Sequence, residues 1–116
     1  MQNTQLVEFV LDKIDDLKAR DVLTFDVKHS SSITDFMIVC SGNSKKHVQS
    51  IAEHVAMEAK KQDMAPLGIE GLETGEWVLL DMGEVVLHVM QDSTRDFYQL
   101  EKLWQDQSQR LQGTDE

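Results

Sequence analysis

The sequence predicts a single α/β domain with a mixed β-sheet and helices packed on it. Two patterns predict this class: some segments repeat apolar residues every three or four positions, as helices do, and others alternate or run continuously apolar, as strands do. A helix-type segment lies between strand-type segments, which is the order of an α/β fold. With 116 residues, 41% of them hydrophobic, the chain is long enough to bury a core without a metal or a disulfide.

The first predicted element is a helix, followed by a strand. The apolar residues of the helix follow a helical spacing, and the charged residues lie largely on the opposite side. Its inward stripe is Leu6, Val10, Ile14 and Leu17, widened by Val7, Phe9 and Leu11. The strand covers Val22–Val27 and shows the two-residue period of a half-buried strand. Its alternating apolar residues are Leu23, Phe25 and Val27.

A central strand and a second helix come next. Phe36–Cys40 is apolar at every position, as in a strand buried on both faces, and a break is expected at Ser41–Asn43. Ser44 is a suitable N-cap for the second helix, which ends before Pro66. The inward stripe of this helix is Val48, Ile51, Ala52, Val55, Ala56 and Ala59.

Three further strands complete a predicted five-stranded sheet. A short strand at Leu67–Glu70 follows the second helix, and strand, helix and strand in that order imply a parallel crossover. Trp77–Asp81 and Val85–Met90 are two apolar runs separated by a three-residue turn. We expect them to be antiparallel neighbours, so the sheet is mixed.

The last predicted helix begins at Asp92 or Ser93, either of which can cap it. Its inward residues are Phe97, Leu100, Leu103 and Trp104. After Trp104 the apolar pattern stops, and residues 105–116 are expected to form a disordered tail outside a single domain of residues 1–104.

Composition limits the classes of function. The formal net charge of -10 opposes direct binding to nucleic acid. It is explained either by solubility alone or by steering toward a basic protein, such as one in a ribosome or in chromatin. The single cysteine, Cys40, is expected to be buried, and one cysteine allows no internal disulfide. No secretory signal and no membrane-spanning run is recognised, so we expect a soluble cytoplasmic protein.

The histidines do not predict a metal site. His47 and His54 are seven residues apart on one helix, more than about 10 Å along its axis, which is too far to share one ion. His88 lies in an apolar strand and must find a polar partner or face a surface. The second alternative would place Val86, His88 and Met90 on one binding face of the sheet.

Motifs for catalysis are scarce. Asp-x-Asp, Gly-x-Ser-x-Gly, P-loop and Gly-x-Gly-x-x-Gly patterns are all missing from the sequence. The turn at residues 41–44 precedes a helix and could hold an anion, although such turns mostly have no ligand. A nucleotidyltransferase or phosphate-handling enzyme using this turn with Asp26, Asp35 or Asp81 is the alternative to a protein that docks without catalysing a reaction and needs no cofactor.

Five segments in order resemble one known family. They are Asp15–Val22, Ser31–Gly42, Pro66–Gly71, Trp77–Met90 and Phe97–Trp104. Their order and spacing, from about Leu6 to Trp104, resemble the ribosomal silencing factor family, also called the Iojap-related family. The resemblance implies a nucleotidyltransferase-like α/β fold that lacks the catalytic carboxylates of that fold.

The resemblance also implies a function and a surface. Members of the family bind ribosomal protein L-fourteen of the large subunit and sterically block its association with the small subunit, which represses translation when nutrients are scarce. The partner-binding residues implied for this chain are Trp77, Met82 and Tyr98, with Glu70, Leu79 and His88 on the same surface. Leucine is common in the family at the position of Met82, and methionine keeps the apolar bulk.

Two questions stay open at this level. An adaptor for ribosome assembly would use the same docking surface and is not separated from a repressor by sequence. An apolar patch around Trp77 and Tyr98 could also pair two copies of the chain into a homodimer in isolation.

Overall fold

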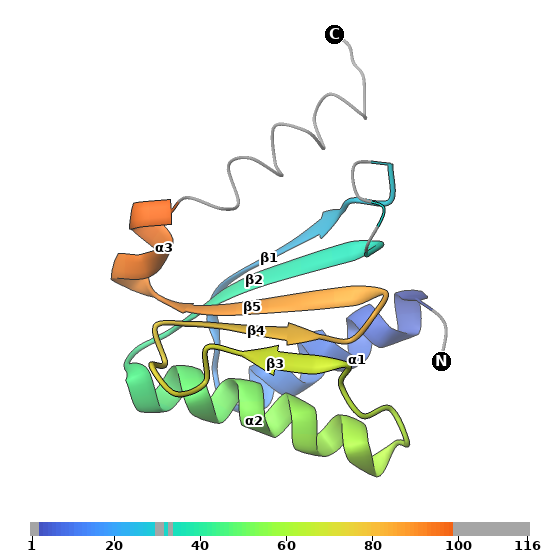
Figure 1. Ribbon diagram of the computed structural model, residues 1–116, viewed down its shortest axis with the longest axis horizontal. Helices are drawn as coiled ribbons and strands as arrows, with labels where there is room; N and C mark the ends of the chain where they lie inside the picture. The colour runs from blue at the N-terminus through green and yellow to red at the C-terminus, as the bar shows by residue number, and fades with distance from the viewer. Residues whose placement is uncertain (1–2, 30–31, 33, 99–116) are drawn as a thin grey trace, which may run out of the picture.

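The computed structural model describes residues 3–29, 32 and 34–98 (Figure 1). The elements in chain order are α1 (Asn3–Asp16), β1 (Arg20–Asp26), β2 (Phe36–Gly42), α2 (Lys45–Lys61), β3 (Gly68–Glu70), β4 (Trp77–Asp81), β5 (Val85–Gln91) and α3 (Asp92–Tyr98). The predicted α/β class with a mixed five-stranded sheet is confirmed.

The strands lie in the order β1-β2-β5-β4-β3. The central pair, β2 and β5, is parallel, and the other three pairs are antiparallel. The chain leaves β2 through α2 and returns in β3, which runs in the same direction as β2 but lies at the far edge, beyond β5 and β4. The parallel crossover is therefore confirmed, although the two strands that it joins are not neighbours.

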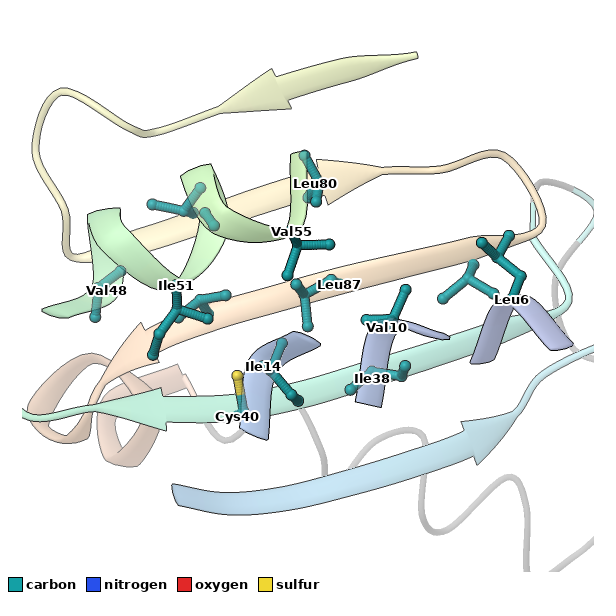
Figure 2. Packing of buried hydrophobic residues seen from close by; sticks show 14 residues of the cluster. Leu6, Val10, Ile14, Ile38, Cys40, Val48, Ile51, Val55, Leu80 and Leu87 are labelled. Carbon is teal, nitrogen blue, oxygen red and sulfur yellow. The ribbon is translucent and has the colours of Figure 1, made fainter. Parts of the chain in front are cut away.

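Both long helices cover one face of the sheet (Figure 1). Figure 2 shows their apolar stripes meeting β2, β4 and β5 in the main core. The helices contribute Leu6, Val10, Ile14, Val48, Ile51, Ala52 and Val55, and the strands contribute Ile38, Cys40, Val78, Leu80, Val85, Leu87 and Val89. Both predicted helical stripes are thus confirmed. Cys40 is buried as expected, and burial raises the pKa of its thiol to about 12, which keeps it protonated.

The opposite face of the sheet, which we call the distal face, carries a smaller core. Its buried residues are Phe25, Val27, Met37, Val39 and Met90, and Trp77 packs against them. Successive strand residues point to opposite faces. The distal face therefore also includes Leu79 on β4 and both Val86 and His88 on β5.

The first strand departs from its predicted pattern. Leu23 alternates with its neighbours and shares the face of Phe25 as predicted, but it is 41% exposed, so the expectation that it is buried is wrong. The register between β1 and β2 shifts between Arg20 and Leu23, and β1 lies at the edge of the sheet. The shift precedes Leu23, which still lies opposite Val39 on the same face as Phe25 opposite Met37. Leu23 is exposed because it lies at the edge of the distal face, which the two long helices do not cover (Figure 1).

The ends of the elements also test the sequence predictions. Ser44 is the N-cap of α2, and its Oγ accepts a hydrogen bond of 3.1 Å from the backbone N–H of His47, as predicted. The expected break at Ser41–Asn43 comes later, because β2 continues to Gly42. The predicted last helix is present as α3 up to Tyr98. Leu100, Leu103, Trp104 and the tail of residues 105–116 lie outside the described residues.

Candidate docking surface

The β4–β5 hairpin determines which predicted site residues share a face. Trp77 lies opposite Met90, and Leu79 lies opposite His88. The hairpin is closed by the N–H of Met82, which donates to the carbonyl of Val85 at 2.9 Å. Within the connection lies Gly83, whose φ of 88° favours glycine. Because residues directly opposite each other share a face, Trp77, Leu79 and His88 all belong to the distal face.

Glu70 joins the same face from the edge strand. It lies opposite Leu79, which in turn lies opposite His88, so these three residues form one row across β3, β4 and β5. Exposure decreases along that row: Glu70 is exposed, Leu79 is half-buried and His88 is 7% exposed. The distal face thus presents a charged edge, an apolar middle and a buried histidine.

Trp77 and His88 are joined by a hydrogen bond. The indole Nε1–H of Trp77 donates to Nδ1 of His88 at 3.0 Å, and the ring centroids are 5.9 Å apart with an interplanar angle of 48°. Burial lowers the pKa of His88 from 6.5 to about 4, so the ring is neutral at pH 7 with its proton on Nε2. The prediction that His88 finds a polar partner is confirmed.

The loop before Trp77 is held on both sides. Gln49 on α2 donates through Nε2 to the carbonyl of Leu72 at 2.8 Å, and Gln91 at the end of β5 donates to the carbonyl of Gly75 at 2.8 Å. Gly71 has φ of 82°, and a Cβ there would lie 2.1 Å from the carbonyl oxygen of Trp77. The loop therefore sets the position of the Trp77 backbone, and only glycine allows the close approach.

Met82 and Tyr98 are placed differently from Trp77. Met82 follows the last residue of β4, about 17 Å along the strand from Trp77, and its half-buried side chain packs against the helix-side core. The structure therefore does not bring Met82 together with Trp77 on the distal face. Tyr98 is the last residue of α3, which begins where β5 ends (Figure 1). Its side chain lies outside the described residues.

Two polar contacts that the sequence analysis missed hold α3 against the sheet. Arg95 is 7% exposed, and its Nη1 donates to Oγ of Ser41 on β2 at 2.8 Å. Arg20 at the start of β1 pairs with Asp92 at the start of α3, also at 2.8 Å. These partners are 54 and 72 residues apart in the chain, and no local pattern in the sequence connects them.

The alternative phosphate site does not form as predicted. Asp26 lies opposite the first residue of β2, Asp35 immediately precedes that strand, and Asp81 lies opposite Val86 near the start of β5. The turn at residues 41–44 follows the other end of β2, about 20 Å away along the strand. None of the three carboxylates named for this site therefore lies beside the turn.

The hollow at that end of the sheet has mixed charge. It encloses about 470 Å³ and is lined by Arg20, Asp21, Ser41, Asp92, Arg95 and Asp96. Its arginines already contact Asp92 and Ser41. Three carboxylates at the lining oppose the binding of a second anion, so the hollow is poorly suited to a phosphate.

The polar contacts of the helix histidines are made within the protein. His54 Nε2 contacts the Asp16 carboxylate at 2.9 Å, and His47 Nε2 contacts the carbonyl of Leu17 at 2.7 Å. Among residues 3–29, 32 and 34–98, no group of three or more His, Cys, Asp or Glu side chains is arranged to hold a metal ion. Over the same described part of the chain, no helix combines the length and apolar character needed to cross a membrane.

Comparison with known proteins identifies the family. The family described as "Ribosomal silencing factor during starvation" matches residues 1–116. The "Ribosomal silencing factor RsfS" of Haemophilus influenzae is 44% identical over 99 residues, covering 85% of this chain and 97% of the relative. The mouse "Mitochondrial assembly of ribosomal large subunit protein 1" is 32% identical over 89 residues, covering 74% of this chain and 39% of that protein.

A solved structure agrees with the sequence relatives. The crystal structure of a protein from Chromobacterium violaceum superposes with a TM-score of 0.88 at 33% identity, and the match covers all of this chain and 91% of the other. Fold, sequence match and coverage agree over nearly the whole length. The chain therefore belongs to the ribosomal silencing factor family.

Proposed function

We propose that this protein represses translation in the cytoplasm by binding the large ribosomal subunit through ribosomal protein L-fourteen and blocking association with the small subunit. Membership of the ribosomal silencing factor family supports an action on the ribosome. The structural observation that carries the proposal is the distal face, where Trp77 and Leu79 are half-buried beside the exposed Glu70. Blocking by occlusion needs a surface and no chemistry, so the protein acts as a regulator and not as an enzyme.

The charge of the whole chain and the large side chains of the distal face suit a basic protein partner. Ribosomal proteins are basic because they sit on RNA, and a chain with a net charge of -10 can approach one without competing for phosphates. Large half-buried side chains such as Trp77 are the residue type that contributes most affinity at interfaces. Glu70 at the exposed edge would set approach and register, and Leu79 would extend the apolar contact.

Met82 and Tyr98 would be reached only by a partner that extends past the two ends of this surface, and Met82 would offer only the exposed part of a side chain that packs on the helix-side core. Met82 belongs to the hairpin connection beyond β4, and Tyr98 ends α3 beyond β5. A partner that covers β4 along its length would reach the hairpin on one side and α3 on the other. His88 lies beneath this surface and contacts Trp77.

Sedimentation of purified ribosomal subunits tests the proposal. With the protein added, we expect it to comigrate with the large subunit and fewer whole ribosomes to form. Trp77→Ala should weaken binding by about 1–2 kcal/mol, or roughly 5- to 30-fold, without loss of folding by circular dichroism. Met57→Ala is the matched control, because Met57 is 53% exposed on α2, the helix covering the opposite face. Unchanged formation of whole ribosomes and no comigration would contradict the proposal.

A second candidate function is assembly of the large subunit. The observation that favours it is the mouse mitochondrial relative, whose name refers to that assembly. Both functions would use the same docking surface, and timing separates them. Depletion of the protein during rapid growth should cause large-subunit precursors to accumulate if assembly is its role, whereas a repressor alone should leave the precursor profile unchanged.

A homodimer in isolation is the further partner that we propose for the distal face. Two copies would cover each other's Trp77 and Leu79, which are half-buried in the single chain. Light scattering at increasing protein concentration should then show a dimer, and Trp77→Ala should shift the equilibrium toward the monomer. A monomer at all concentrations would contradict this part of the proposal.

A further inference from the structure

The indole N–H of Trp77, the largest side chain of the proposed docking surface, is hydrogen-bonded within the protein. Trp77 is half-buried on the distal face, and its Nε1–H donates to His88 Nδ1 at 3.0 Å. Tryptophan at an interface commonly offers its N–H to the partner. Here that donor already has an acceptor in the same chain, on the neighbouring strand.

We propose that His88 is the positioning residue of the docking surface: its Nδ1 accepts the Trp77 indole N–H and so holds the ring in the orientation that the partner meets. This inference rests on the proposed function, since it concerns the same surface. His88 would act through Trp77 and without contacting the partner, because only 7% of it is exposed.

His88 lies on an interior strand of the sheet, where its own position is well fixed. It lies on β5, the strand between β2 and β4, with Val39 opposite on one side and Leu79 opposite on the other. Trp77 is its diagonal neighbour on the same face, at the first residue of β4. A side chain that is fixed in the centre of a sheet can hold a ring at the end of the next strand, where the backbone follows a loop.

The hydrogen bond between Trp77 and His88 lowers the conformational entropy that Trp77 loses when the partner binds. A large side chain that is immobilised only on association loses roughly 0.5–1.5 kcal/mol of conformational freedom, and a side chain already held in place avoids that loss. The tilted contact of the two rings, 5.9 Å between centroids, restricts the indole further. Preorganisation of this kind improves affinity without adding a contact to the partner.

The same bond also restricts the chemistry of the partner. The indole N–H already has an acceptor within the chain, so it is not needed as a donor to the partner. A partner pocket for Trp77 therefore needs no hydrogen-bond acceptor at that point and should be apolar. A polar group placed there would lose its water without gaining a bond.

Two substitutions separate positioning from simple packing. His88→Leu removes the acceptor and places an apolar side chain there, whereas His88→Asn retains an acceptor, the amide oxygen, close to the position of Nδ1. His54→Leu is the matched control, since His54 lies on α2 and pairs with Asp16. Circular dichroism should show that all three variants are folded.

The first measurement needs no ribosome. The indole N–H resonance of Trp77 is recorded by ¹⁵N NMR of the full chain and assigned with Trp77→Phe, because the chain has two tryptophans. We expect the indole proton to be shifted downfield and slow to exchange in the wild type and in His88→Asn. It should lose both properties in His88→Leu. Rapid exchange of this proton in the wild-type protein would overturn the proposal without any variant of His88.

The second measurement is binding to purified large ribosomal subunits. We expect His88→Leu to weaken binding about fivefold, the equivalent of one lost hydrogen bond. His88→Asn should recover most of the affinity, and His54→Leu should bind like the wild type. Equal binding by all variants would overturn the positioning role, while leaving the proposed function intact. If the wild type itself fails to bind, the proposed function fails, and the NMR result still decides whether His88 holds Trp77.

Discussion

Replacing Gly71 by alanine should both destabilise the fold and weaken ribosome binding, because Gly71 lies against the backbone of Trp77. Its φ of 82° costs an alanine roughly 1–2 kcal/mol. The new Cβ would lie 2.1 Å from the carbonyl oxygen of Trp77, so the backbone must move to make space. Such overpacking typically costs about 1–3 kcal/mol. Together these terms predict a loss of roughly 2–5 kcal/mol in the free energy of unfolding.

Gly68→Ala is the matched control for this experiment. Gly68 begins β3, the short strand that ends immediately before Gly71, and an added Cβ at Gly68 meets no atom within 4 Å. We expect its free energy of unfolding to stay within about 1 kcal/mol of the wild type or to rise slightly. Urea denaturation followed by circular dichroism measures both variants. Binding to large ribosomal subunits is measured at temperatures where both remain folded.

The binding result follows from the position of the clash. A shift of the Trp77 carbonyl moves the first residue of β4 and with it the indole, so Gly71→Ala should bind more weakly even when it is folded. Gly68→Ala should bind like the wild type. Equal stability of the two variants would refute the argument from close approach. Normal binding by a destabilised Gly71→Ala would show that the loop does not position the anchor.

Three further predictions concern pH, helix anchoring and the two faces of β4. The free energy of unfolding should fall by up to about 3 kcal/mol between pH 6.5 and pH 4, because the unfolded chain protonates His88 at its ordinary pKa while burial lowers the folded pKa to about 4. His88→Asn should flatten this part of a pH series of urea denaturations, and an unchanged slope would contradict the assignment. Arg95→Leu should weaken subunit binding by loosening α3. Ser41→Ala should lower the free energy of unfolding by about 1–3 kcal/mol, since it leaves the buried Arg95 side chain with one acceptor fewer. Wild-type stability in Ser41→Ala would count against the contact between Arg95 and Ser41. Leu80→Ala should lower the free energy of unfolding by about 2–5 kcal/mol in the same denaturation assay. Leu79→Ala should cost little stability and should weaken ribosome binding. A larger loss of stability in Leu79→Ala than in Leu80→Ala would mean that the faces of β4 are assigned wrongly.

Local patterns predicted most of the secondary structure because burial imposes a period on each element. The stripe of α2, its cap at Ser44 and the continuous apolar run of β2 follow from residues that are near one another in the chain. Such patterns cannot say where a strand lies in the sheet. Leu23 alternates correctly with its neighbours, yet it is exposed, because β1 is an edge strand and Leu23 lies on the face that the two long helices do not cover.

For the candidate surface too, the sequence predicts the residue types and the tertiary structure decides how they are grouped. Its residue types could be proposed from the sequence and from the resemblance to a family, since large apolar and aromatic side chains near turns are typical of interfaces. Their grouping depends on the hairpin register, in which Asp81 pairs with Val86 and not with Val85. A register one residue shorter would place Trp77 on the face of Val89, away from His88.

By itself, therefore, the sequence determined the fold class, the order of the elements, the helical stripes and the family. Each of these follows from period, composition or motif order along the chain. Only the tertiary structure decided that Trp77, Leu79, Glu70 and His88 share one face, that Met82 packs on the other side and that the indole N–H is bound within the protein. The physical reason is that strand pairing brings together residues from distant positions in the chain, and a shift of one residue exchanges the two faces of a strand.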